Sequence, residues 1–221
     1  KLSTKSVIEK IDESFIQDNN NNQSFFKKYH YERYLSPLKL IDLEIPNFII
    51  PIKPHWAEAL FNDKSEQKLA LFEPEYELLL NRENVYYRSS TSRILQAPAR
   101  ILWYVSKNKS SNEKGSIIAT SYIDEIFIDN PKKLYKQFQK LGVYKWKHIA
   151  ETAGKNETIM AFVFSDTELF KRSISLKNIY DQFEILEGKR FMPVTPRKIK
   201  SETYLSFYKL GMDLWFTIKI Y

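Results

Sequence analysis

The feature that most constrains the fold is a series of short apolar or alternating runs, each of strand length, that begins at residue 47. The runs cover residues 47–53, 84–89, 99–106, 116–128, 157–165 and 215–221. In the last run Phe216, Ile218 and Ile220 alternate with polar residues, the pattern of a strand with one buried face. The sequence therefore predicts a sheet rather than a helical bundle.

Helical patterns fall between these runs. We expect helices over residues 54–61, 131–141 and 145–152. The second begins after a capping residue, Asn130, has Pro131 at its first position and ends before Gly142. Because strands and helices do not alternate regularly, we predict an α+β fold: a small β-barrel or a strongly curved, mostly antiparallel sheet with peripheral helices.

The first 45 residues have a different character, polar and helical. One helix carries the apolar stripe Val7, Ile8, Ile11 and Phe15 and is expected to end in the asparagine run 19–22. A second helix is expected over residues 25–34. We predict that residues 1–45 form a helical appendage or the end of an upstream domain, and that residues 46–221 form one domain. The start at Lys1 rather than Met favours a processed end or a piece of a longer protein.

Composition excludes several classes of site. The chain has no cysteine, three dispersed histidines (His30, His55, His148) and five glycines, no two of them within ten residues. Thiolate chemistry, multi-histidine metal sites, P-loops and dinucleotide fingerprints are therefore excluded, and we expect neither metal nor cofactor. No run approaches the ~18 to 20 apolar residues of a membrane span. We predict a cytoplasmic protein without a membrane partner.

Positive charge is concentrated in two segments. The formal net charge is +7. Residues 131–149 contain no acid and six lysines: Lys132, Lys133, Lys136, Lys140, Lys145 and Lys147. Residues 186–200 add Lys189, Arg190, Arg197, Lys198 and Lys200 against Glu187. Lys132, Lys136 and Lys140 are spaced to line one helix face. Clustered cations among aromatic residues favour a polyanion with bases that stack, although a solvated helix face gives the same pattern.

Three segments then resemble, in their order, the ASCH branch of the PUA-like superfamily, whose relatives include EVE and YTH domains. They are IKPHWAEALF (52–61), NVYYR (84–88) and RILWYVS (100–106), and the resemblance extends over about residues 47–185. It implies a small β-barrel that holds RNA, or a flipped or modified base, in a cleft at one end. It also implies a bacterial protein in which such a domain is often fused to another.

The sequence departs from the family where the family's chemistry lies. Members carry Gly-x-Lys before the strand that ends in Arg, and an acid two residues before that Arg. Asn81, Glu83 and Tyr86 stand in these places. The resemblance therefore implies binding without the family's amidohydrolase activity.

The candidate nucleic-acid-binding residues share a strand end, a strand face or a basic segment. They are Lys53, Trp56, Tyr87, Arg88, Trp103, Ser106, Ser121, Trp146, Lys132, Lys136, Lys140, Lys145, Lys147 and Arg197. Each has a structural alternative: the tryptophans could pack in the core, Arg88 could form an ion pair, and the serines could cap turns.

Three functions stay open. The first is a module that binds RNA or DNA, single-stranded or with a modified or flipped base, in an aromatic cleft with a basic rim. The second is a metal-independent enzyme acting on RNA or a modified nucleoside through His55 or Lys53, with His55 and His148 as an acid–base pair. The third is a protein-interaction domain of a larger protein.

Overall fold

The protein is described by a computed structural model of the 221-residue chain. The structure describes residues 21–61, 82–90, 93–106, 115–192 and 194–214. The chain divides into two compact units, Lys1–Glu44 and Ile45–Tyr221. The role of the first unit as an appendage or the end of an upstream domain stays a prediction.

The described part of the first unit contains one helix, α2 (Asn21–Tyr34). We expected Asn21 and Asn22 to end a helix, but they form the first turn of α2. Glu32 is buried and accepts a hydrogen bond from the Leu40 amide at 2.6 Å, which ties the following turn back to the helix. The helix expected before residue 19 lies outside the described residues.

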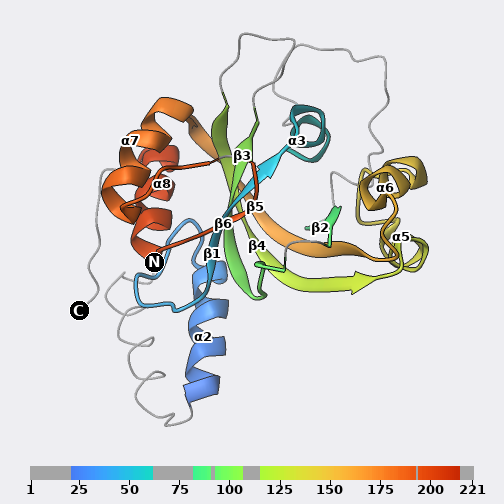
Figure 1. Cartoon of the computed structure of the whole chain (residues 1–221). Helices are drawn as coiled ribbons and strands as arrows, with labels where there is room; N and C mark the ends of the chain where they lie inside the picture. Colours follow the sequence, from blue (N-terminus) through green and yellow to red (C-terminus); the bar gives the residue numbers. More distant parts are fainter. Residues whose placement is uncertain (1–20, 62–81, 91–92, 107–114, 193, 215–221) are drawn as a thin grey trace, which may run out of the picture. The chain divides into compact units, whose positions relative to one another are not determined.

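The second unit is built on one open sheet of six strands (Figure 1). The strands are β1 (Asn47–Ile52), β2 (Glu83–Ser89), β3 (Ala99–Val105), β4 (Ser116–Asp129), β5 (Ile159–Ser175) and β6 (Arg197–Ile199). Their order is β2-β5-β4-β3-β1-β6, with β1 and β3 parallel and the other neighbours antiparallel. Register shifts along the β4–β5 ladder accompany a bend of both strands (Figure 1). The curved, mostly antiparallel sheet is confirmed, and closure into a barrel is not.

Helices cover both faces of this sheet (Figure 1). They are α3 (Pro54–Phe61), α5 (Pro131–Phe138), α6 (Trp146–Ala153), α7 (Leu176–Glu187) and α8 (Ser201–Met212). Helices α3, α5 and α6 lie on one face, and α7 and α8 lie on the other. None of the helices in the described ranges combines the length and the apolar character that crossing a bilayer requires.

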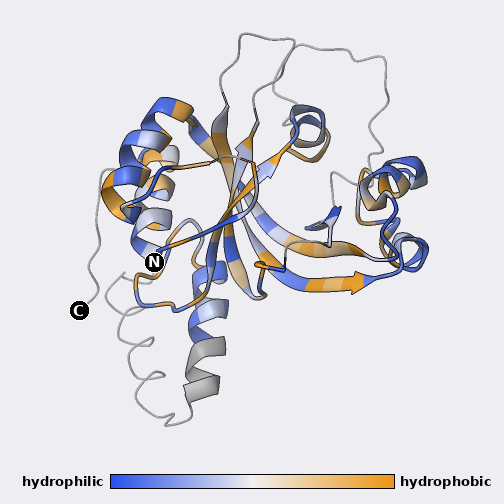
Figure 2. Ribbon diagram, in the orientation of Figure 1, coloured by the Kyte–Doolittle hydropathy of each residue, from blue (hydrophilic) through white to orange (hydrophobic). Residues whose placement is uncertain are grey.

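The sheet separates two hydrophobic cores, which explains why residues 101–105 of β3 form a continuous run of apolar and aromatic side chains. In β3, Ile101 and Trp103 belong to the core under α3, α5 and α6, whereas Leu102 and Tyr104 belong to the core under α7 and α8. Successive strand residues point to opposite faces, so a strand covered on both sides must be continuously apolar. Figure 2 shows that hydrophilic residues lie along α5, α6 and α7, outside these cores.

The sequence predictions were right for the first five strands and incomplete after them. Strand β5 runs on to Ser175 instead of ending at residue 165, and α7, β6 and α8 were not expected. The expected sixth strand, 215–221, lies outside the described residues. Helix α5 ends at Phe138 rather than Leu141, so Lys140 lies beyond it and does not continue the helix face of Lys132 and Lys136.

Candidate functional site

The end of β1 leads without a linker into α3. The amides of Trp56 and Ala57 both donate to the Lys53 carbonyl at 3.0 Å, which starts the helix with Pro54 in its first turn. Next to it, Ser106 donates from its amide and its hydroxyl to the Ile52 carbonyl at 3.0 and 2.9 Å. Ser106 therefore joins the ends of the parallel pair β1 and β3. Lys53 is exposed at this joined end.

Trp56 brings the two candidate histidines together. Its ring lies 4.6 Å from His55 and 4.8 Å from His148, measured between centroids, with Tyr144 at 4.3 Å. The Lys145 amide donates to His148 Nδ1 at 3.2 Å, so a neutral His148 carries its proton on Nε2. Burial lowers the pKa of His55, and the positive charges of Lys53 and His148 lower it further. We call Lys53, His55, Trp56 and His148 the histidine cluster.

Three buried tyrosines adjoin this cluster. Tyr144 lies 6.0 Å from Tyr86 and 5.2 Å from Tyr87, ring to ring, and the Tyr87 hydroxyl donates to the Leu134 carbonyl at 3.3 Å. Burial raises the pKa of Tyr86 to about 12 and also raises those of Tyr87 and Tyr144. The phenols are therefore neutral near pH 7 and offer rings and hydroxyls, but no negative charge.

Arg88 follows these tyrosines on β2 and is half-buried. Burial lowers the pKa of Arg88, and Tyr86 acts in the opposite direction. Its Nε is buried without a hydrogen-bond partner, and no ion pair with a carboxylate occurs at Arg88 in the described part of the chain. The ion-pair alternative for Arg88 therefore finds no support. A partly desolvated guanidinium is suited to an anion or a base edge.

Trp103 and Ser121, both expected at a ligand, lie in the core. Trp103 is 0% exposed, and its Nε1 donates to the Ser121 hydroxyl at 2.9 Å. The Trp103 ring packs against Phe61, Tyr86 and Phe164 at centroid distances of 5.0 to 5.4 Å. The only donor of the indole is thus satisfied inside the protein, and neither side chain is accessible to a ligand in this structure.

The lysines of the first basic segment are exposed around α5 and α6. We call Lys132, Lys136, Lys140, Lys145 and Lys147 the lysine group. Their neighbour Lys133 differs because it pairs with Asp129. Arg197 is not brought to this group, since it lies on β6, at the opposite edge of the sheet from β2.

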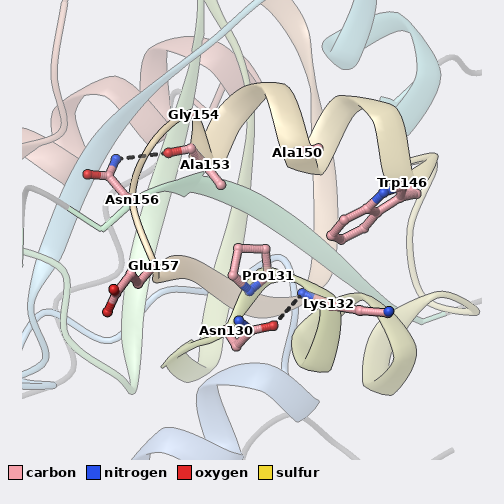
Figure 3. Close-up of a pocket in the computed structure, with 9 residues that line it drawn as sticks. All are labelled: Asn130, Pro131, Lys132, Trp146, Ala150, Ala153, Gly154, Asn156 and Glu157. Carbon is pink, nitrogen blue, oxygen red and sulfur yellow. Dashed lines mark hydrogen bonds between the residues drawn. The ribbon is translucent and has the colours of Figure 1, made fainter.

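Trp146 is partly exposed at the start of α6, beside an open pocket between α5 and α6 (Figure 3). It is 42% exposed and packs on Tyr135 at 5.8 Å between ring centroids, so the alternative that it packs in the core finds no support. The lining consists of Asn130, Pro131, Lys132, Trp146, Ala150, Ala153, Gly154, Asn156 and Glu157.

Some of these neighbours were not expected from the sequence. Tyr144 was not expected, because it lies before α6 and its contact with Trp56 joins segments far apart in the sequence. The three candidate tryptophans do not converge, since Trp56, Trp103 and Trp146 contact different aromatic neighbours. Within the described ranges no three His, Asp or Glu side chains are grouped to hold a metal ion.

No protein-family model matches the sequence, and no curated protein matches it. Solved structures do match the fold. The ASCH protein of Zymomonas mobilis aligns with a TM-score of 0.54 at 15% identity, covering 74% of this chain and 94% of that one. Two point mutants of the same protein align with a TM-score of 0.54 at 16% identity, covering 74% of this chain and 95% and 97% of theirs. The chain thus shares the fold of this ASCH protein, the fold that the order of its motifs predicted.

Proposed function

We propose that this protein is a nucleic-acid-binding module that reads an RNA or DNA strand, with an unpaired or modified base held beside Arg88 and Trp56. The observation that carries the proposal is the lysine group. Lys132, Lys136, Lys145 and Lys147 are exposed and have no carboxylate partner in the described part of the chain. Like charges held close together repel each other, and a polyanion relieves that repulsion while releasing counterions.

Trp56 and Arg88, which lie on elements next to the lysine group, support recognition of a base. Helix α6 packs against both α5 and β2, so the lysine group adjoins the strand that carries Arg88. Trp56 offers a half-buried ring, and Arg88 offers a half-buried guanidinium beside the neutral Tyr86. A ring for stacking and a guanidinium for hydrogen bonds are the two groups that a single base requires.

The test is binding of labelled single-stranded RNA and DNA oligonucleotides, unmodified or carrying a methylated or acylated cytosine, at two salt concentrations. We expect Arg88→Gln to weaken binding and to reduce any preference for the modified strand. Arg190→Gln, an exposed change beyond α7, is the matched control. Wild-type protein that binds no strand at low salt, or that binds only an acidic protein, would refute the proposal and favour the protein-interaction alternative.

A second candidate function follows from the contact of both imidazoles with Trp56. In RNA cleavage one imidazole would take the proton from the 2′-hydroxyl as its oxygen attacks phosphorus, and the other would protonate the departing 5′-oxygen. The products are a 2′,3′-cyclic phosphate and a free 5′-hydroxyl. This function predicts that RNA but not DNA is cut, and that His55→Ala and His148→Ala each abolish cutting while binding persists. Intact RNA after prolonged incubation with wild-type protein would exclude it.

A further inference from the structure

We propose that the pocket between α5 and α6 is a second nucleotide subsite, in which an unpaired base of the same strand stacks on Trp146. This inference rests on the proposed function and extends it from one base to a strand that runs over two sites. The subsite would require a single strand, because paired bases cannot present a face to a side chain.

The hollow exists because small residues line it where two short helices meet. Ala150, Ala153 and Gly154 belong to the last turns of α6 and to its end, and Pro131 begins α5 opposite them (Figure 3). Both boundaries are fixed by hydrogen bonds: the Lys132 amide donates to Asn130 Oδ1 at 3.0 Å, and the Gly154 amide donates to the Ala150 carbonyl at 3.0 Å. The pocket is therefore bounded by two helix ends, each closed by a hydrogen bond.

Trp146 supplies the stacking surface. It is exposed, whereas Trp56 is half-buried and Trp103 is fully buried, and its ring is supported from one side by Tyr135 at 5.8 Å. Figure 3 shows the ring over the pocket, at the end where Lys132 lies. A large apolar ring exposed to water loses unfavourable hydration when a base covers it.

Charge around the pocket identifies the occupant. Lys145 and Lys147 flank Trp146 in the chain, and Lys132 lines the same pocket. Asn156 and Glu157 stand at the other end, where the Glu157 carboxylate repels phosphate (Figure 3). The phosphates of a strand would therefore follow the lysines while its base enters between the helices. An apolar partner would not favour a ring surrounded by exposed ammonium groups, whereas a nucleotide matches both features.

The experiment measures the affinity of Trp146→Ala and Trp146→Phe for a series of single strands of increasing length, in RNA and in DNA. Trp146→Ala should weaken binding of the longer strands by about 5- to 150-fold, the effect of losing ~1 to 3 kcal/mol of stacking, without changing the salt slope. Dinucleotides that occupy only the Arg88 site should bind as before, and Trp146→Phe should retain most of the affinity. Ile185→Ala, an exposed apolar change on α7, is the control.

A second readout does not depend on affinity. Saturating a wild-type sample with an unlabelled strand should quench tryptophan fluorescence, and the Trp146→Phe variant should lose the part of that quenching that comes from Trp146 while keeping the part that a base beside Trp56 causes; Trp103 is buried and should contribute little. If the wild-type protein binds the strands and the Trp146 variants show the same affinity and the same quenching, the subsite is refuted and the proposed function is unaffected. Wild-type protein that binds no strand would overturn both.

Discussion

Whether a candidate residue lines a cleft or packs in the core depends on its contacts, and Trp103 is the clearest case. The pattern of β3 places Trp103 on one face with Ile101, and either a cleft wall or a core position fits that pattern. The structure gives the indole a core position and a hydrogen-bond partner, the Ser121 hydroxyl. Ser121 also shares a hydrogen bond with Thr167 at 2.8 Å, so the polar atoms at this point of the core form a connected set. The sequence could not show which position Trp103 takes, because Ser121 and Thr167 come from two other strands.

This arrangement predicts the effect of Ser121→Ala. The change would leave the Trp103 N–H buried without an acceptor, which costs about 1 to 3 kcal/mol of the free energy of unfolding. Urea denaturation checks this, with Ser173→Ala, an exposed serine of β5, as the control. If Ser121→Ala unfolds at the same urea concentration as the control, the hydrogen bond contributes nothing to stability.

The buried tyrosines make stability depend on alkaline pH. The pKa of Tyr86 rises from 10.0 to about 12 on folding, so between those values the unfolded chain loses its proton first. The unfolded state then binds fewer protons, and the free energy of unfolding falls as pH rises through this window. Tyr86→Phe should reduce the loss between about pH 9 and about pH 11 by ~1.4 kcal/mol, measured by urea denaturation at both pH values. An identical loss in wild type and variant would mean that Tyr86 titrates normally in the fold.

At the scale of elements, α5 and α6 carry most of the lysine group, and the histidine cluster lies between α3 and α6. The start of α5 was predictable because its cap is local: Asn130 binds the amide two residues on, and Pro131 follows it. The end of α5 was not predictable, because the helix stops at Phe138 and no glycine marks that position. The lysine spacing beyond that point therefore does not describe a helix face.

The lysine group predicts a salt dependence. Lys132→Glu/Lys136→Glu should flatten the dependence of affinity on salt, because each phosphate contact contributes a logarithmic slope of ~0.7 on a single strand. Lys171→Glu/Lys177→Glu makes the same change of net charge on exposed lysines of β5 and α7, so it serves as the control. Equal slopes for both double variants would mean that net charge, rather than this helix, governs binding.

Helix α8 depends on a close approach to β5 that the sequence did not reveal. A Cβ at Gly211 would overlap the ring of Phe170, so only glycine fits this contact. Gly211→Ala gains ~1 kcal/mol of helix propensity but must displace the ring, and overpacking costs about 1 to 3 kcal/mol. We expect a net destabilisation in thermal unfolding, compared with Leu210→Ala on an exposed position of α8. A stabilised Gly211→Ala variant would show that Phe170 moves aside freely.

At the scale of the molecule, the sequence predicted what depends on neighbours in the chain. Five strands were located correctly because their apolar runs are local, and the motif order indicated the fold. The parallel pairing of β1 with β3 and the return of β6 to β1 bring together segments far apart in sequence, which no local pattern records. The histidine cluster could be suggested but not located for the same reason, since it joins α3 to α6.

The second unit needs the residues just before β1 for its stability. Among the described residues, both cores start at β1, with Phe48 and Ile49 as their first members, so a chain that starts at Ile45 should fold cooperatively. A chain that starts at Phe48 should be less stable. It lacks the Pro46 carbonyl that accepts from the Arg100 amide at 2.9 Å, and the Asn47 amide group that donates to Ser201 at 3.1 Å. Each buried group left without a partner costs about 1 to 3 kcal/mol. Urea denaturation of both fragments beside the full chain is the measurement, and a fragment from Ile45 that fails to fold would mean that the unit requires residues before it.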